Sequence, residues 1–249
     1  MSGHSKWATI KHKKGAADQA RGKLFAKLIR QVEVAARTGG GDPDMNPTLR
    51  TMFQKARDSS VPLDTIERAI KRGTGELEGV TYESITYEGY GPAGVAVLVE
   101  VLTDNRNRTG SDIRSVFSKR GGSMAEPGAV GWQFERKGTV LVPGEVDEDE
   151  LMLAAIDAGA DDIVREGPSW RVTTPPAELH TVTRALEEAG IPVESAELTM
   201  TPTTAVALDD VGAAKKVLQL IDALEEHDDV QEVHANFDVP DAILEKVEV

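Results

Sequence analysis

The sequence predicts an α+β protein with an N-terminal three-helix domain followed by two α/β domains, one inserted into the other. Apolar residues recur at helical spacing up to about residue 78, whereas short apolar or alternating runs typical of strands dominate from residue 79 onward. Residues 136–201 follow the order β-α-β-β-α-β, and the stretches on either side of them complete a second unit of that order. The chain of 249 residues is long enough for several such cores.

The chain begins with a basic arm, residues 1–20, that is expected to be flexible or partly helical. The arm is rich in Lys, Gly and Ala and has no clean hydrophobic period. From Gly22 a helical period begins, with apolar side chains from Leu24 to Ala36 on one side. Four cations fall on the opposite side, which is expected to face water: Lys23, Lys27, Arg30 and Arg37.

Two shorter helices complete the predicted helical domain. Asn46 followed by Pro47 is typical of an N-cap with proline at the first helical position. The third helix follows Pro62, and Gly73 is expected to cap its C-terminal end. The stretch "RGTGELEG" that follows predicts a linker.

The two α/β units are predicted from short strands separated by helical patterns. The outer unit begins with strands at 84–90 and 94–103, a helix at 110–122 and a strand at 129–135. It ends with a strand at 204–209, a helix at 211–226 and a strand at 230–237. The inserted unit has strands at 138–144, 161–166, 169–174 and 193–200, with helices at 147–158 and 176–189.

Both units have the ferredoxin-like element order, the outer one with an extra leading strand. The sequence therefore predicts four segments: the arm, a helical domain, a discontinuous ferredoxin-like domain and an inserted ferredoxin-like domain. Their expected bounds are 1–20, 21–78, 79–135 plus 202–249, and 136–201.

The composition excludes several classes of protein. The chain has no cysteine, which excludes thiol catalysis, disulfides and Cys-based zinc sites. No apolar run reaches the roughly 18 residues that a membrane span requires, and no apolar signal-peptide region stands at the N-terminus. A cytoplasmic location is therefore expected.

The formal net charge of −14 is unevenly distributed. Residues 1–78 contain 15 Lys or Arg and 9 Asp or Glu, a net charge of +6, whereas the remaining 13 and 33 give −20. A polyanion would be attracted to the first part of the molecule and repelled by the rest. Because phosphate neutralisation releases counterions, this pattern favours nucleic-acid contact by the N-terminal part.

The arm and the first helix therefore supply the main candidate site. Trp7 is expected to stack on an exposed base or to anchor the arm. The residues expected to neutralise phosphates are Lys6, Lys11, Lys13, Lys14, Arg21, Lys23, Lys27 and Arg30.

A second, weaker candidate is the stretch "LTDNRNRTGSDIR". A strand ends there, and Thr109 or Ser111 is expected to cap the next helix. Backbone N–H groups at the helix start, flanked by Arg106 and Arg108, could hold a phosphate. The alternative is Asn-rich turn chemistry with incidental surface arginines.

Other motifs favour structural roles. "GYGPAG" matches the dinucleotide fingerprint in letters, but a strand follows it, so a hairpin turn is expected. The spacing of His4 and His12 fits no helical metal-ligand pair. The acid clusters "VDEDEL" and "EEHDDV" are interpreted as a helix start and a solvated turn, with Mg²⁺ binding as the alternative. No cofactor, metal site or catalytic residue is predicted.

Several stretches resemble the YebC/PmpR family, whose relatives include mitochondrial translational activators. The resemblance covers roughly residues 3–142 and is carried by "GHSKWATIKHKK", "RGKLFAKLIRQVEVAAR", "GGGDPDMNPTLR" and "YEGYGPAGVAVLVEVLTDNRNRTGSDIR", among others. It implies three domains and a non-enzymatic cytoplasmic protein that regulates transcription by binding DNA, while other members are linked to ribosomes. One departure is Glu126, which argues against a phosphate role for the hairpin "GGSMAEPGAVGW".

The sequence thus predicts a nucleic-acid-binding regulator of gene expression with no membrane partner and no small-molecule substrate. DNA-binding transcription regulation is the first hypothesis, and a ribosome-associated translation factor that contacts ribosomal RNA is the alternative. A flexible lysine arm suits sequence-independent contact with shaped RNA at least as well as duplex readout. Two remoter alternatives are a Mg²⁺-dependent enzyme and an adaptor that binds proteins through its acidic surface.

Overall fold

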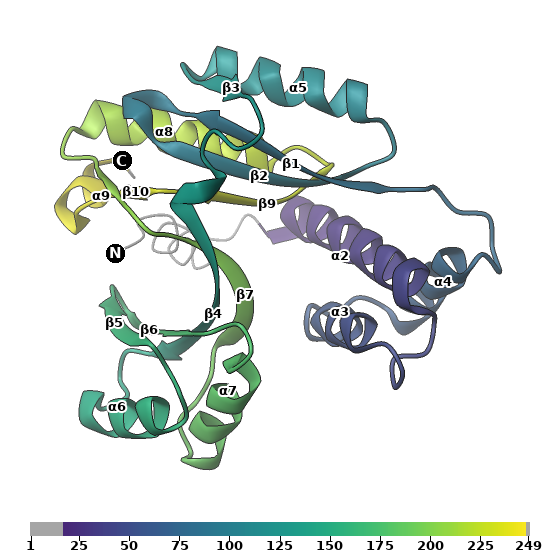
Figure 1. The fold of residues 1–249 in the computed structure, drawn as a ribbon, viewed down its shortest axis with the longest axis horizontal. Coiled ribbons are helices and arrows are strands. Elements are labelled where there is room, and N and C mark those ends of the chain that lie inside the picture. The colour runs from purple at the N-terminus through teal and green to yellow at the C-terminus, as the bar shows by residue number, and fades with distance from the viewer. Residues whose placement is uncertain (1–16, 248–249) are drawn as a thin grey trace.

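The structure, a computed structural model, describes residues 17–247 and confirms the predicted fold class. Figure 1 shows a helical head and two regions of antiparallel sheet, one above the other, joined by a pair of long strands. Among residues 17–247, none of the helices combines the length and apolarity that crossing a membrane requires.

The head contains α2 (Ala17–Gly39), α3 (Pro47–Asp58) and α4 (Leu63–Thr74). Because α2 already begins at Ala17, the last residues of the predicted arm are helical. Asn46 caps α3 as predicted: its Oδ1 accepts a hydrogen bond from the Leu49 amide, and its Nδ2 donates to the carbonyl of Ala35 in α2. The buried apolar core of the head is Leu28, Val32, Ala35, Ala36, Leu49, Ala56, Val61, Ile66 and Ala69.

The predicted C-cap of α4 was wrong by two residues. Gly75, with φ of +85°, is the cap, whereas Gly73 lies inside the helix. A Cβ on Gly73 would stand within 2.4 Å of the Glu33 carbonyl oxygen of α2. Gly73 is therefore needed for close approach of two helices, which local sequence does not distinguish from a cap.

The first sheet has the strand order β3-β1-β2-β9, with every neighbouring pair antiparallel. Its core lies between one face of the sheet and the helices α5 (Arg106–Lys119) and α8 (Val211–Glu225), and includes Val99, Phe117 and Leu220. The strands are β1 (Glu83–Tyr90), β2 (Ala96–Thr103), β3 (Ser123–Ala125) and β9 (Val230–Ala235).

Two strand predictions for this unit were wrong. The segment predicted as a strand over 204–209 contributes only β8 (Val206–Ala207), which pairs in parallel with β10 (Phe237–Asp238). The ferredoxin-like order predicted that this segment would be a central strand of the sheet, next to β2. That position is taken by β1, which was predicted as an additional leading strand, because the short turn at "GYGPAG" joins β1 directly to β2 as a hairpin.

The segment predicted as a strand over 129–135 also has a different structure from the one expected. Gly131–Gln133 forms a 3₁₀ turn (η2), and the strand begins only at Phe134. The carboxylate of Glu88 on β1 accepts hydrogen bonds from the amides of Gly128, Val130 and Gly131 at 2.6 to 2.8 Å. These amides are therefore occupied by a side chain and do not form a strand ladder.

The second sheet has the order β5-β6-β4-β7, which is the ferredoxin-like arrangement. Helices α6 (Glu148–Asp157) and α7 (Leu179–Glu188) pack on it around a core that includes Val172, Leu151 and Leu186. Its strands are β4 (Phe134–Pro143), β5 (Asp162–Glu166), β6 (Ser169–Thr174) and β7 (Ser195–Pro202). The last helix described is α9 (Asp241–Val247).

Candidate nucleic-acid interface

The predicted site residues are only partly described by the structure. Arg21 lies in α2, and the side chains described are those of Lys23, Lys27, Arg30, Arg106 and Arg108. The arm residues Lys6, Trp7, Lys11, Lys13 and Lys14 lie outside the described residues.

The basic stripe of α2 does not face open water as predicted. It lies against the C-terminal end of α8, where Lys23 Nζ donates to the carbonyl of Glu226 at 3.0 Å. Lys27 Nζ donates to the carbonyl of Glu225 at 3.0 Å, and Arg30 Nη1 donates to that of Asp228 at 2.7 Å. In Figure 1 the N-terminal end of α2 lies beside β9, the strand that follows α8.

The acidic turn "EEHDDV" is the partner of this stripe and not a solvated charge run. The last carbonyls of a helix have no intrahelical donor and carry the negative end of the helix dipole. Lysine and arginine side chains supply hydrogen-bond donors to these carbonyls and positive charge opposite the dipole. The contact therefore joins the head to the end of α8. The sequence contained the two halves of this contact, but their separation of about 200 residues hid the pairing.

Asp229, in the same turn, is the centre of a second set of contacts. Its side chain is only 7% exposed and lies 3.0 Å from Arg30 Nη1 and 2.9 Å from Arg108 Nη2. The hydroxyl of Thr109 donates to Asp229 Oδ2 at 2.7 Å. Burial alone would raise the pKa of Asp229, but the hydrogen bonds from Thr109 and Arg108 and the charges of Arg108 and Arg30 outweigh it and hold the pKa below its usual value.

Arg106 and Arg108 lie in the first turn of α5 and not in a loop before it. The cap is Asn105, whose side chain accepts a hydrogen bond from the Arg108 amide, in place of the predicted Thr109 or Ser111. Arg108 is committed to Asp104 at 2.8 Å as well as to Asp229. The two arginines therefore differ: Arg108 is internally neutralised, whereas the Arg106 side chain is exposed with no ion pair to another residue of the described part.

Helix α5 carries further exposed cations that the sequence interpretation did not single out. Arg114, Lys119 and Arg120 are exposed, and within residues 17–247 none of their side chains forms a hydrogen bond or ion pair. Together with Arg106 they give α5 and its C-cap four exposed cations that are available to an anionic partner.

A groove of about 310 Å³ lies between α2, α3 and β2. Its wall includes Val34, Met52 and Leu102, and no charged side chain lines it. The groove therefore offers no cationic side chain of the described residues to a phosphate.

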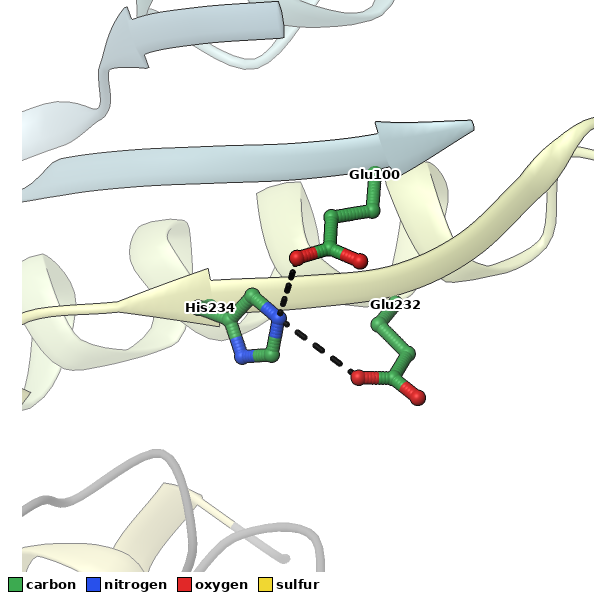
Figure 2. Close-up of side chains that lie close together, drawn as sticks. All are labelled: Glu100, Glu232 and His234. Atoms are coloured by element: carbon green, nitrogen blue, oxygen red, sulfur yellow. Dashed lines mark ion pairs between the residues drawn. The ribbon is translucent and has the colours of Figure 1, made fainter. Parts of the chain in front are cut away.

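The face of the first sheet opposite α5 and α8 holds a cluster that sequence analysis missed. Glu100 on β2 lies directly opposite Glu232 on β9, and His234 Nε2 lies 3.6 Å from a carboxylate oxygen of each. Figure 2 shows all three side chains turned toward one another. The pattern Glu-x-His in β9 puts two ligand types on one strand face, but only strand pairing adds Glu100, which is 132 positions before Glu232.

The two carboxylates of this cluster have opposite pKa shifts. The nearby imidazole of His234 lowers the pKa of Glu100 against the effect of burial. Burial raises the pKa of Glu232, and the electrostatic effects of His234 and Lys55 only partly oppose it.

Comparison with known proteins gives matches along almost the whole chain. A family model described as the N-terminal domain of TACO1/YebC proteins matches residues 5–76, and one described as their second and third domains matches residues 82–237. The crystal structure of the conserved hypothetical protein Aq1575 from Aquifex aeolicus is similar, with a TM-score of 0.82 and 49% identity. That match covers 90% of this chain and 93% of the Aquifex chain.

Similar curated proteins share one name. A "Probable transcriptional regulatory protein" from Halothermothrix orenii is 56% identical over 250 residues, which is 99% of each chain. A protein of the same name from Rubrobacter xylanophilus is 59% identical over 249 residues, again 99% of each chain. The name describes those proteins as regulators of transcription.

Proposed function

Because this chain belongs to the TACO1/YebC family, we propose that it is a cytoplasmic, non-enzymatic regulator of gene expression that acts by binding nucleic acid. The relatives' names support regulation of transcription. The observation that carries the nucleic-acid part of the proposal is the distribution of positive charge.

Most of the positive excess of the N-terminal part resides in its first 16 residues. These contain four lysines and no acid, whereas residues 17–78 contain 11 basic and 9 acidic residues, a net charge of +2. The two values add to the +6 of residues 1–78. Since Lys23, Lys27 and Arg30 are engaged by α8, the arm is the main source of cations for phosphate contact.

The exposed cations of α5 form the second part of the proposed interface. Arg106 replaces the pair Arg106 and Arg108 of the sequence hypothesis, because Arg108 is held by Asp104 and Asp229. Arg114 on α5 and Arg120 at its C-cap are further exposed cations of this part of the molecule. Arginine is well suited to phosphate because its guanidinium offers several donors in one plane.

A ribosome-associated factor that contacts ribosomal RNA is the second candidate. The observation in its favour is the position of α2, the long basic helix of the head. Its basic side is turned to α8, so α2 cannot act as a recognition helix in a major groove while this contact holds. A lysine arm that binds backbone without reading bases fits structured RNA as well as DNA.

The salt dependence of binding tests the proposed role of the arm. Changing Lys6, Lys11, Lys13 and Lys14 to Gln removes four expected phosphate contacts. The slope of log affinity against log salt should then fall by about 3.6 for duplex DNA or about 2.8 for a single strand. The measurement is a salt titration of full-length wild-type and variant protein with duplex DNA and with structured RNA.

The matched control changes four exposed lysines elsewhere, Lys71, Lys215, Lys216 and Lys246, to Gln. This variant has the same net charge as the arm variant and should keep the wild-type slope. An unchanged slope in the arm variant on every nucleic acid, or an equal loss in the control, would contradict the proposal. A larger loss of affinity for RNA than for DNA would favour the second candidate.

A further inference from the structure

We propose that Glu100, Glu232 and His234 bind a divalent transition-metal ion, with Zn²⁺ as the best-suited species. Each residue offers one ligand atom, and the three atoms lie within 4.8 Å of one another. The His234 side chain is 5% exposed, whereas those of Glu100 and Glu232 are 44% and 37% exposed. One side of the cluster is therefore fixed by packing, and the carboxylates can adjust.

The separations fit an ion between the ligands better than direct contact. His234 Nε2 lies 3.6 Å from one oxygen of each glutamate, beyond the 2.7 to 3.2 Å usual for an N–H···O hydrogen bond. Two ligand atoms about 2.1 Å from a tetrahedral ion lie about 3.4 Å apart. In Figure 2 the Nε2 edge of the imidazole points into the space between the two carboxylates.

The charges around the cluster also favour a bound cation. Glu100 and Glu232 are directly opposite on neighbouring strands, an arrangement in which like charges repel. Within residues 17–247, Glu197, Lys55 and Arg136 are the other charged groups that act on these two carboxylates, and Lys55 is itself paired with Glu197 at 3.3 Å. With a neutral imidazole, the three glutamates and two cations leave an excess of negative charge that a divalent ion would neutralise.

The donor set selects the class of metal. One imidazole nitrogen and two carboxylate oxygens suit Zn²⁺ and neighbouring transition ions, whereas Mg²⁺ and Ca²⁺ prefer oxygen ligands alone. Three protein ligands leave a fourth position, which a water molecule would take. The strand register holds Glu100 and Glu232 in place, so binding would tie β2 to β9.

Titration with the metal alone tests this site. Full-length protein without an affinity tag is freed of metal with a chelator and titrated with Zn²⁺ in a calorimeter, and with Co²⁺ in a visible spectrometer. The wild-type protein should take up one ion more than the variants H234Q and E100Q, and its melting temperature should rise with Zn²⁺. Changes at groups that only orient a ligand lower affinity about 10- to 100-fold, so loss of a ligand should cost at least about 100-fold.

The control is H180Q, which removes an exposed histidine of α7 and should bind as the wild type does. Because His4 and His12 are retained in every variant, the difference in stoichiometry isolates this cluster. If H234Q fails to fold, E100Q decides, since its side chain is partly exposed. Equal uptake by wild type and E100Q, or no uptake by the wild type, would overturn the proposal.

Discussion

At Asp229 a single carboxylate connects three parts of the molecule. Asp229 follows α8 and forms ion pairs with Arg30 of the head and with Arg108 of α5. It also accepts a hydrogen bond from the hydroxyl of Thr109 in α5. A buried carboxylate of this kind is stabilised only as long as its partners are present and it remains ionised. Asp229 therefore ties the docking of the head to the protonation state of one group.

The variant D229N should lower the free energy of unfolding by about 2–3 kcal/mol at pH 7, because hydrogen bonds to charged groups contribute about 1.5–3 kcal/mol each. Because the pKa of Asp229 is lowered in the folded protein, Asp229 becomes protonated at a higher pH in the unfolded chain than in the folded protein. The stabilisation is therefore complete above the ordinary aspartate pKa of about 3.9 and is lost as the pH falls through the lower native pKa. Urea unfolding at a series of pH values measures the difference.

The control for this prediction is D228N, one position earlier. The Asp228 side chain is exposed, and it is the Asp228 backbone carbonyl that accepts the hydrogen bond from Arg30. It should unfold as the wild type does at every pH. A D229N penalty that stays constant down to pH 2 would show that charge on Asp229 does not carry the effect.

At the scale of elements, α2 has two distinct faces with two distinct partners. Its apolar face forms the core of the head with α3 and α4, and its basic side closes the C-terminal end of α8. Glu33, also on α2, is buried and forms an ion pair with Arg72 of α4, with 2.9 Å between Glu33 Oε2 and Arg72 Nε. The helix thus positions the head on the first sheet, and the cations at its start have a structural role.

Reversing both Lys23 and Lys27 to Glu should weaken this contact. Glutamate would face the carbonyls and the acids at the end of α8, where each cation contributes about 0.3–1 kcal/mol. Loss and repulsion together should cost about 1–2 kcal/mol and lower the melting temperature by about 2–8 °C. Thermal unfolding measures the change in melting temperature. Amide hydrogen exchange in the last turn of α8 should also be faster in the variant than in the wild type.

The variant K215E/K216E is the matched control for the double reversal. It makes the same change in net charge at two exposed positions of α8 that lie far from its C-terminal end. It should melt close to the wild type. If both double variants melt alike, net charge and not the contact with α8 accounts for the effect.

At the scale of the whole molecule, β4 and β7 connect the two sheet regions. They pair from Phe134 opposite Pro202 to Leu141 opposite Ser195, and the upper ends of both strands lead back to the first sheet (Figure 1). The core below them is separate: its nine buried apolar residues all lie within residues 140–191. Two paired antiparallel strands thus connect two separate cores.

We expect residues 134–202 to fold when excised, since the segment contains its own core and all four strands of its sheet. Trp170 is the only tryptophan of this fragment, is 5% exposed, and donates from Nε1 to the Val146 carbonyl. Its fluorescence should therefore show a blue-shifted emission that is lost in one cooperative step with urea. Emission typical of exposed tryptophan without a transition would count against an independent inserted domain.

The sequence by itself determined the fold class, the positions of most elements and the separation of charge. Periodicity of 3.6 or 2 residues and caps such as Asn46 are local, so they can be identified without knowledge of the partner. The same locality explains the errors: a glycine that permits helix contact resembles a cap, as at Gly73, and a short segment such as β8 cannot show which strand it will pair with.

The tertiary structure alone decided which polar groups meet. A pattern shows that Lys23, Lys27 and Arg30 share one side of a helix, but not that the end of α8, about 200 residues away, will cover that side. Likewise, Glu100 meets Glu232 and His234 only through the register of β2 with β9. Apolar periodicity encodes which surface is buried, whereas the pairing of charges depends on the three-dimensional packing of elements that are distant in sequence.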